Sequence, residues 1–180
     1  YEIMPSLVGS EMCIRDSGNK MNAAIVRYVR STYNVLIGDS TADRVKREIG
    51  TVWTEGQPEK TVEVKGRNLV TGLPQKITLS SYELEMPLRI EVERIITALQ
   101  SVMEQTPPEL VADIEKNGLL MTGGGAMLDG LDKLITSRVR IRAHLAENPI
   151  EAVAIGTGKS FEYLGKLYDG FVSYTNYSSR

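Results

Sequence analysis

The sequence has few of the residues that build disulfides or metal centres. It contains one cysteine, Cys13, and one histidine, His144. A single cysteine cannot form an internal disulfide, and these two side chains cannot make a zinc cluster. The low cysteine content fits a reducing, cytoplasmic setting. No nucleophile–base pair of the hydrolase kind can be assembled either, so the sequence predicts no catalytic residues and no metal ligands.

Long apolar runs and a strong charge of one sign are also lacking. No stretch of about eighteen apolar residues is present, which excludes a transmembrane helix. The net charge is −2, whereas nucleic-acid-binding proteins normally have a basic face, so we expect no nucleic-acid partner. With 180 residues, 42% of them hydrophobic, the chain can build one domain or slightly more.

The two ends of the chain differ from the rest. The segment SLVGSEMCIRDS at 6–17 resembles a translated sequencing-adapter read-through, and nothing before it resembles a signal peptide. We therefore expect residues 1–17 to be a non-native leader, with a real but irregular N-terminal arm as the alternative. The polar tail at 168–180 is expected to fray.

Hydrophobic periodicity predicts a mixed first half. Apolar residues at helical spacing indicate a helix at 21–36 that Gly38 ends, and a second helix at 41–50. We expect Asp39 and Ser40 to cap the second helix, and its buried stripe to be Ala42, Val45 and Ile49.

Alternation of polar and apolar residues then predicts two strands, at 61–65 and 76–80. They would pair antiparallel, with loop at Gly66 and at 72–74. Together with the helix at 41–50, they indicate a small α+β subdomain at 38–85.

The second half alternates helices and strands, as an α/β layer does. The expected elements are a long helix after Pro87, a helix after Thr106 with Leu110 and Ile114 inside, a buried strand at 119–122, a helix after the glycines, a strand at 139–145 and a helix after Pro149.

The strongest chemical signal is Gly123-Gly124-Gly125-Ala126, between an apolar strand and an amphipathic helix. Three glycines let the backbone approach a ligand without any Cβ in the way, and the next helix offers free N–H groups. Ligands of α/β sheets bind at such carboxyl ends of strands. A tight turn without a ligand explains the pattern about equally well.

A second signal lies on the helix at 41–50, where Asp43, Lys46 and Arg47 occupy neighbouring turns. An acid beside a cation could bracket a ribose and a purine ring, although a solvated helix face is the commoner origin of such a pattern.

The segment IGTGKS at 155–160 is not a phosphate loop. The Walker pattern requires a glycine where Val153 stands, and the segment follows a helical pattern. We expect Gly156 and Gly158 to be close-packing positions.

Taken in order, these pieces resemble the MreB family of bacterial actins. The matching stretches are GNKMNAAI (18–25), YVR (28–30), LIG (36–38), TADRVK (41–46), EIG (48–50), VKGRNL (64–69), PPEL (107–110), LMTGGGA (120–126) and AVAIGTGK (152–159). Their common order and spacing make the resemblance specific over residues 18–167.

The resemblance implies an α/β fold of the actin-like ATPase (ribonuclease H-like) kind, of which this chain is a C-terminal part. Residues 18–37 and 86–167 would form part of the large subdomain of the second lobe, and 38–85 its inserted small subdomain. The first lobe, with the catalytic groups, would lie upstream. The chain alone is therefore expected to have no ATPase activity.

In the family, ATP lies between the two lobes with Mg²⁺. Carried over by position, the binding candidates are Asp43, Arg44, Val45, Lys46, Gly123, Gly124, Gly125 and Ala126. The family usually has Glu where this chain has Asp43, so the carboxylate would fall about one methylene short of a ribose hydroxyl.

The resemblance also implies that the intact protein couples ATP hydrolysis to self-association into filaments. These would lie in the cytoplasm at the inner membrane surface, organise the cell-wall elongation machinery and determine rod cell shape. Another nucleotide-binding member of the actin superfamily, a chaperone or sugar-kinase relative, is the alternative.

Overall fold

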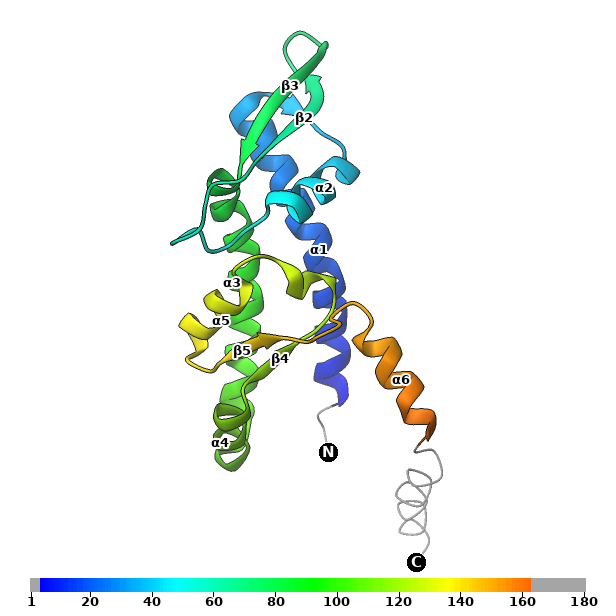
Figure 1. The fold of residues 1–180 in the computed structure, drawn as a ribbon, viewed down its shortest axis with the longest axis vertical. Helices are drawn as coiled ribbons and strands as arrows, with labels where there is room; N and C mark the ends of the chain where they lie inside the picture. Colours follow the sequence, from blue (N-terminus) through cyan, green and yellow to red (C-terminus); the bar gives the residue numbers. More distant parts are fainter. Residues whose placement is uncertain (1–3, 163–180) are drawn as a thin grey trace, which may run out of the picture.

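A computed structural model describes residues 4–162 of the chain and the side chains of residues 18–161. The tail predicted at 168–180 lies outside the described residues. The molecule is elongated, with the long helices α1 and α3 side by side along its length (Figure 1). The hairpin of β2 and β3 lies at one end and α4 at the other.

Helix α1 (Met4–Tyr33) ends earlier than the hydrophobic pattern predicts. Asn34 has a φ of 53°, a left-handed conformation that breaks the helix, and Val35–Leu36 then form the short strand β1. This strand pairs antiparallel with β2. The predicted helix end at 36 is therefore wrong, because Val35 and Leu36 form a strand at the edge of the sheet.

Helix α2 (Asp39–Ile49) has the predicted buried stripe. Its N-cap, however, is Gly38, whose carbonyl oxygen accepts hydrogen bonds from the backbone N–H groups of Thr41 and Ala42. The prediction that Asp39 and Ser40 are the caps is wrong, since both already lie in the first turn.

Strands β2 (Thr61–Asn68) and β3 (Pro74–Ser80) pair antiparallel, as predicted, in a sheet of order β1-β2-β3. Gly66 is part of β2 and not of a loop. A Cβ at Gly66 would lie 2.4 Å from Cγ1 of Val35, so the absence of a side chain lets β1 approach β2.

Helix α3 (Ser81–Gln105) begins before Pro87, which lies inside it, so the predicted start is wrong. A capping box sets the true start. Ser80 Oγ accepts a hydrogen bond from the backbone N–H of Tyr82 at 3.2 Å, and the backbone N–H of Ser80 donates to Glu83 Oε2 at 3.0 Å. The buried face of α3 packs along α1 and includes Leu84, Leu88, Val92 and Ile96.

The C-terminal part is less buried than its sequence predicts. Helix α4 (Pro108–Asn117) ends at Gly118 as expected, but Leu110 is 54% exposed and does not form an inner face. Strand β4 (Leu119–Met121) pairs parallel with β5 (Ala143–Leu145). Leu120 of β4 is 62% exposed, so the expectation of a buried strand is wrong.

Helix α5 (Leu131–Val139) takes up the start of the strand predicted at 139–145. Arg140, with a φ of 62°, ends the helix, and only the last residues of that segment reach β5. Helix α6 (Ala152–Glu162) projects from the side of the molecule (Figure 1). Of the helices in the described range, none is long and apolar enough to cross a membrane.

Candidate functional site

Asp43 and its two cations meet on α2 as the spacing predicts. Asp43 Oδ1 lies 2.9 Å from Lys46 Nζ, and Asp43 Oδ2 lies 2.6 Å from Arg47 Nη2. The hydrogen bond from Lys46, supported by the charges of both cations, holds the pKa of Asp43 below its ordinary value despite partial burial. Asp43 therefore carries a fixed negative charge at neutral pH.

Lys46 also ties α2 to α1. Its Nζ donates to Oδ1 of Asn22 at 2.7 Å and approaches the carbonyl oxygen of Gly18 at 3.4 Å. An ammonium has three protons, so with Asp43 these three oxygens account for all of them. In this arrangement Lys46 orients the Asp43 carboxylate. Asn22 is buried and was not identified from the sequence, because it lies far from Lys46 along the chain.

The other two α2 candidates point in different directions. Arg44 is exposed and pairs with Glu48 Oε2 at 3.2 Å. Val45 is fully buried in the core, so its side chain cannot contact a ligand. The side chains of Asp43 and Arg44 thus both reach the surface, whereas that of Val45 does not.

The glycine turn follows β4 but does not open an α-helix. Gly123, with a φ of 86°, leads into a 3₁₀ turn, η1 (Gly124–Met127), and α5 begins only at Leu131. The prediction that the glycines run straight into a helix is wrong. The turn is anchored by the backbone N–H of Gly123, which donates to the carbonyl oxygen of Pro149 at 2.6 Å.

The packing of this chain does not require glycine at positions 124 and 125. A Cβ built on Gly124 or Gly125 would meet nothing within 4 Å, and neither residue has a positive φ. In contrast, a Cβ on Gly130 would lie 2.4 Å from Cβ of Trp53. The tight-turn explanation therefore accounts for Gly123 alone, and the other two glycines leave open space above the backbone.

A backbone connection brings the two candidate stretches into one region. The segment after α2 forms an isolated parallel bridge between Thr51 and Asp129, four residues beyond Gly125. The backbone N–H of Val52 donates to the carbonyl oxygen of Asp129 at 3.0 Å, and Thr51 Oγ1 donates to the same oxygen at 3.2 Å. In Figure 1 the segment between β4 and α5 accordingly lies below α2.

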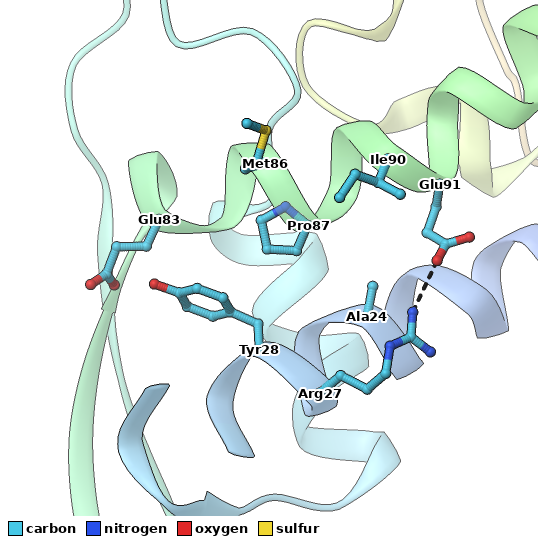
Figure 2. Close-up of a pocket in the computed structure, with 8 residues that line it drawn as sticks. All are labelled: Ala24, Arg27, Tyr28, Glu83, Met86, Pro87, Ile90 and Glu91. Atoms are coloured by element: carbon cyan, nitrogen blue, oxygen red, sulfur yellow. Dashed lines mark hydrogen bonds and ion pairs between the residues drawn. The ribbon is translucent and has the colours of Figure 1, made fainter. Parts of the chain in front are cut away.

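Two hollows lie elsewhere on the surface. One, of about 350 Å³, is a groove between α1 and α3 lined mainly by apolar atoms. Figure 2 shows Tyr28 and Arg27 of α1 facing Pro87 and Glu91 of α3, with Arg27 Nη2 3.0 Å from Glu91 Oε1. The other, of about 490 Å³, lies among α3, α4 and α5. Neither includes a candidate nucleotide residue.

The structure also shows where the remaining sequence motifs lie. The segment IGTGKS lies within α6, which confirms that it is no phosphate loop. A Cβ on Gly156 or Gly158 would meet nothing within 4 Å, so the close-packing prediction is wrong. His144 is exposed on β5, and the side chains in the described range include no cluster of potential metal ligands.

The sequence as a whole matches a family described as MreB/Mbl protein, over residues 4–169. That range includes most of the predicted leader. The cell shape-determining protein Mbl of Bacillus subtilis is 42% identical over 154 residues, which cover 86% of this chain and 46% of that protein. The cell shape-determining protein MreB of Escherichia coli is 41% identical over 151 residues, covering 84% and 43%.

Solved structures give the same assignment. The crystal structure of MreB5 of Spiroplasma citri bound to ADP superposes with a TM-score of 0.80 at 32% identity, covering 84% of this chain and 46% of that one. A second MreB5 structure, bound to AMPPNP, superposes equally well. The MamK double helical filament, at 18% identity and a TM-score of 0.57, shares the fold. The chain thus spans about half the length of the relatives it matches.

Proposed function

Because this chain belongs to the MreB/Mbl family and has an actin-like fold, we propose that it is the C-terminal part of an ATP-binding filament protein that determines cell shape. The family match over most of the chain carries this proposal, supported by relatives named for cell-shape determination. The intact protein would polymerise at the inner membrane surface and organise cell-wall synthesis.

In this proposal the described residues belong to the second lobe of an actin-like (ribonuclease H-like) ATPase. Residues 18–37 and 86–167 form part of the large subdomain and 38–85 the small one, preceded by a foreign leader at 1–17. The packing of α2 on the β-hairpin supports the small unit. Strand β1, which completes its sheet, lies just before residue 38.

The adenosine end of the nucleotide would lie between α2 and the glycine turn. Asp43 would accept a hydrogen bond from a ribose hydroxyl, with Lys46 holding the carboxylate in place. Gly123, Gly124, Gly125 and Ala126 would pass close to the nucleotide. The relatives bound to ADP and AMPPNP support a nucleotide in this fold, and the open space above Gly124 and Gly125 supports this location.

The phosphates and Mg²⁺ would be held by the rest of the intact protein, since the side chains in the described range offer no metal cluster. When bound, Mg²⁺ would neutralise phosphate charge during hydrolysis. The 180-residue chain supplies only part of the cleft. We therefore expect isothermal calorimetry on residues 18–180 to show no micromolar ATP affinity.

A substitution in the glycine turn tests the proposed nucleotide site directly in the full-length protein. Gly124→Ala should lower ATP affinity about tenfold or more, because a methyl group would fill the space left for the nucleotide. The free energy of unfolding should change by less than about 1 kcal/mol, since the new Cβ meets no protein atom.

Gly156→Ala is the matched control, because Gly156 also has open space around it but lies in α6, away from the turn. Its ATP affinity, measured with a fluorescent ATP analogue, should equal that of the parent. Unchanged binding in Gly124→Ala would refute the proposed site.

A chaperone or sugar-kinase relative with the same fold is the second candidate. The 42% and 41% identities to Mbl and MreB favour the filament protein. Two assays on the full-length protein would separate these functions. A filament protein should form polymers that sediment in the presence of ATP, whereas a sugar kinase should transfer phosphate from ATP to a sugar.

A further inference from the structure

We propose that Asn22 is a positioning residue for ribose recognition, which acts through Lys46 on the Asp43 carboxylate and does not itself contact the nucleotide. The inference rests on the proposed nucleotide site and deepens it. It adds a residue of α1, outside α2 and the glycine turn, on which the preference for a ribose over a sugar without hydroxyls would depend.

The three side chains form a series of contacts that runs from the core to the surface. Asn22 Oδ1 lies 2.7 Å from Lys46 Nζ, and the same nitrogen lies 2.9 Å from Asp43 Oδ1. Exposure rises in this order, because Asn22 is 4% exposed, the side chain of Lys46 17% and that of Asp43 29%. The Asn22 end is therefore closed to a bound molecule, whereas the Asp43 end is open to one.

The buried end of the series is held by the packing of α1 against α2. Met21 and Ile25, on either side of Asn22 in the sequence of α1, both belong to the core. On α2, the residue before Lys46 is Val45, which is fully buried. Side chains in a close-packed interior keep defined rotamers. Asn22 thus gives the long, flexible side chain of Lys46 a fixed point of attachment.

Of the two α2 members of the series, only Asp43 keeps bonding capacity for a ligand. The three protons of Lys46 go to Asn22, to Asp43 and, at 3.4 Å, to the carbonyl oxygen of Gly18. The Asp43 carboxylate binds Lys46 through Oδ1 and Arg47 through Oδ2. A carboxylate has about four lone-pair sites, so it can still accept a hydrogen bond from a ribose hydroxyl.

The neutral amide of Asn22 suits this role. It accepts a hydrogen bond from the ammonium of Lys46 without bringing a negative charge that would compete with Asp43. Both Lys46 and Arg47 therefore direct their charge to one carboxylate. Two cations around one carboxylate leave a net positive charge, which favours an anionic ligand such as a nucleotide nearby.

A fixed carboxylate discriminates between sugars, whereas a mobile one does not. A site built to hydrogen-bond a hydroxyl rejects the analogue that lacks it, because the polar group of the site is then left unpaired. That penalty requires the acceptor to stay within about 0.5 Å of its working position. Loss of the Asn22 contact should therefore reduce the preference for ribose more than it reduces nucleotide binding as a whole.

The test compares ATP with dideoxy-ATP, which lacks both ribose hydroxyls, in the full-length protein. The parent should bind ATP about tenfold more tightly, as expected for a hydrogen bond to a charged group. Asn22→Leu, similar in shape but without an acceptor, should reduce this preference to about twofold or less, and Asn22→Ala should do the same. Asn22→Asp, which keeps an acceptor oxygen at this position, should retain the preference.

Ser81→Ala is the matched control, because Ser81 is also buried and its Oγ accepts a hydrogen bond from the backbone N–H of Lys60 at 3.0 Å. Ser81 lies at the start of α3 and is not a nucleotide-site candidate. This variant should keep the ratio of the two affinities. A merely structural role for Asn22 would lower both affinities equally in Asn22→Leu, and an unchanged ratio in that variant would overturn the proposal.

A measurement without nucleotide separates this inference from the proposed site. In the 180-residue chain, heteronuclear NMR should show the ammonium protons of Lys46 exchanging with water about tenfold faster in Asn22→Leu than in the parent or in Asn22→Asp. Unchanged exchange in Asn22→Leu would overturn the role of Asn22 alone. Equal binding of ATP and dideoxy-ATP by the parent would instead overturn the ribose contact of Asp43, and the role of Asn22 with it.

Discussion

Residues 18–105 and residues 108–161 both contain helices and strands with apolar residues, but they differ greatly in burial. The first region, with α1, α2, α3 and the three-stranded sheet, supplies most of the buried core. The second contributes mainly one face of α5, and α4 has no buried residue. Leu120, Ile150 and Val153 of the second region are each more than 60% exposed.

The difference in burial between the two regions shows that a local hydrophobic pattern can specify a helix or a strand without specifying how deeply it is buried. Parallel strands normally have both faces covered, yet β4 and β5 form a two-stranded parallel sheet with exposed apolar residues. The relatives are more than twice as long as the matched part of this chain. The apolar pattern of the second region is therefore not matched by burial among the residues that the structure describes.

The largest effect should come from a cavity in the first region. Leu88 of α3 is fully buried, so Leu88→Ala should lower the free energy of unfolding by about 3 kcal/mol. Leu120→Ala in the second region should cost less than about 1 kcal/mol, because that side chain already contacts solvent. Urea denaturation measures both, and equal costs would remove the contrast between the regions.

A smaller, pH-dependent effect should appear at Asp43. Its folded-state pKa lies below the ordinary value of 3.8, so its ion pairs stabilise the fold above about pH 4. That stabilisation is lost as the pH falls through the folded-state pKa. The difference in urea midpoint between the parent and Asp43→Asn should therefore be full at pH 6 and shrink toward pH 2.

Asp113→Asn, which removes an exposed carboxylate from the middle of α4 in the second region, is the control for Asp43→Asn. Its midpoint should stay close to that of the parent throughout the titration. An Asp43→Asn curve parallel to the parent curve at every pH would show that the ion pairs with Lys46 and Arg47 do not stabilise the fold.

The smallest effect should come from an ion pair that joins the two regions. Lys60 Nζ lies 3.2 Å from Asp129 Oδ2, and both side chains are more than one-third exposed. Lys60→Ala should change the free energy of unfolding by at most about 0.5 kcal/mol, since solvent screens the pair. A cost above about 1 kcal/mol would mean that the two regions are coupled through this contact.

The sequence predicted elements whose signals are local. The spacing of Ala42, Val45 and Ile49 located α2, and alternation located β2 and β3. It missed changes set by single backbone conformations, such as the left-handed Asn34 and Arg140. The capping box at Ser80 and Glu83 was readable, but the helix-breaking tendency of Pro87 concealed it.

The candidate site was predictable only in part. The acid and its cations on α2 lie within one helix, so their spacing predicted their contact. The partners that connect the two stretches are distant in sequence: Asn22 for Lys46 and Asp129 for Thr51. No local pattern identifies such pairs, because tertiary packing alone brings them together.

Trp53 gives the molecule a built-in optical reporter. It is the single tryptophan of the chain, and its Cβ and backbone lie against Gly130, a few residues beyond the glycine turn. Indole emission depends on the polarity and motion of its surroundings. Changes at the turn, whether from a nucleotide or from an added methyl group, should therefore be visible in intrinsic fluorescence without any attached dye.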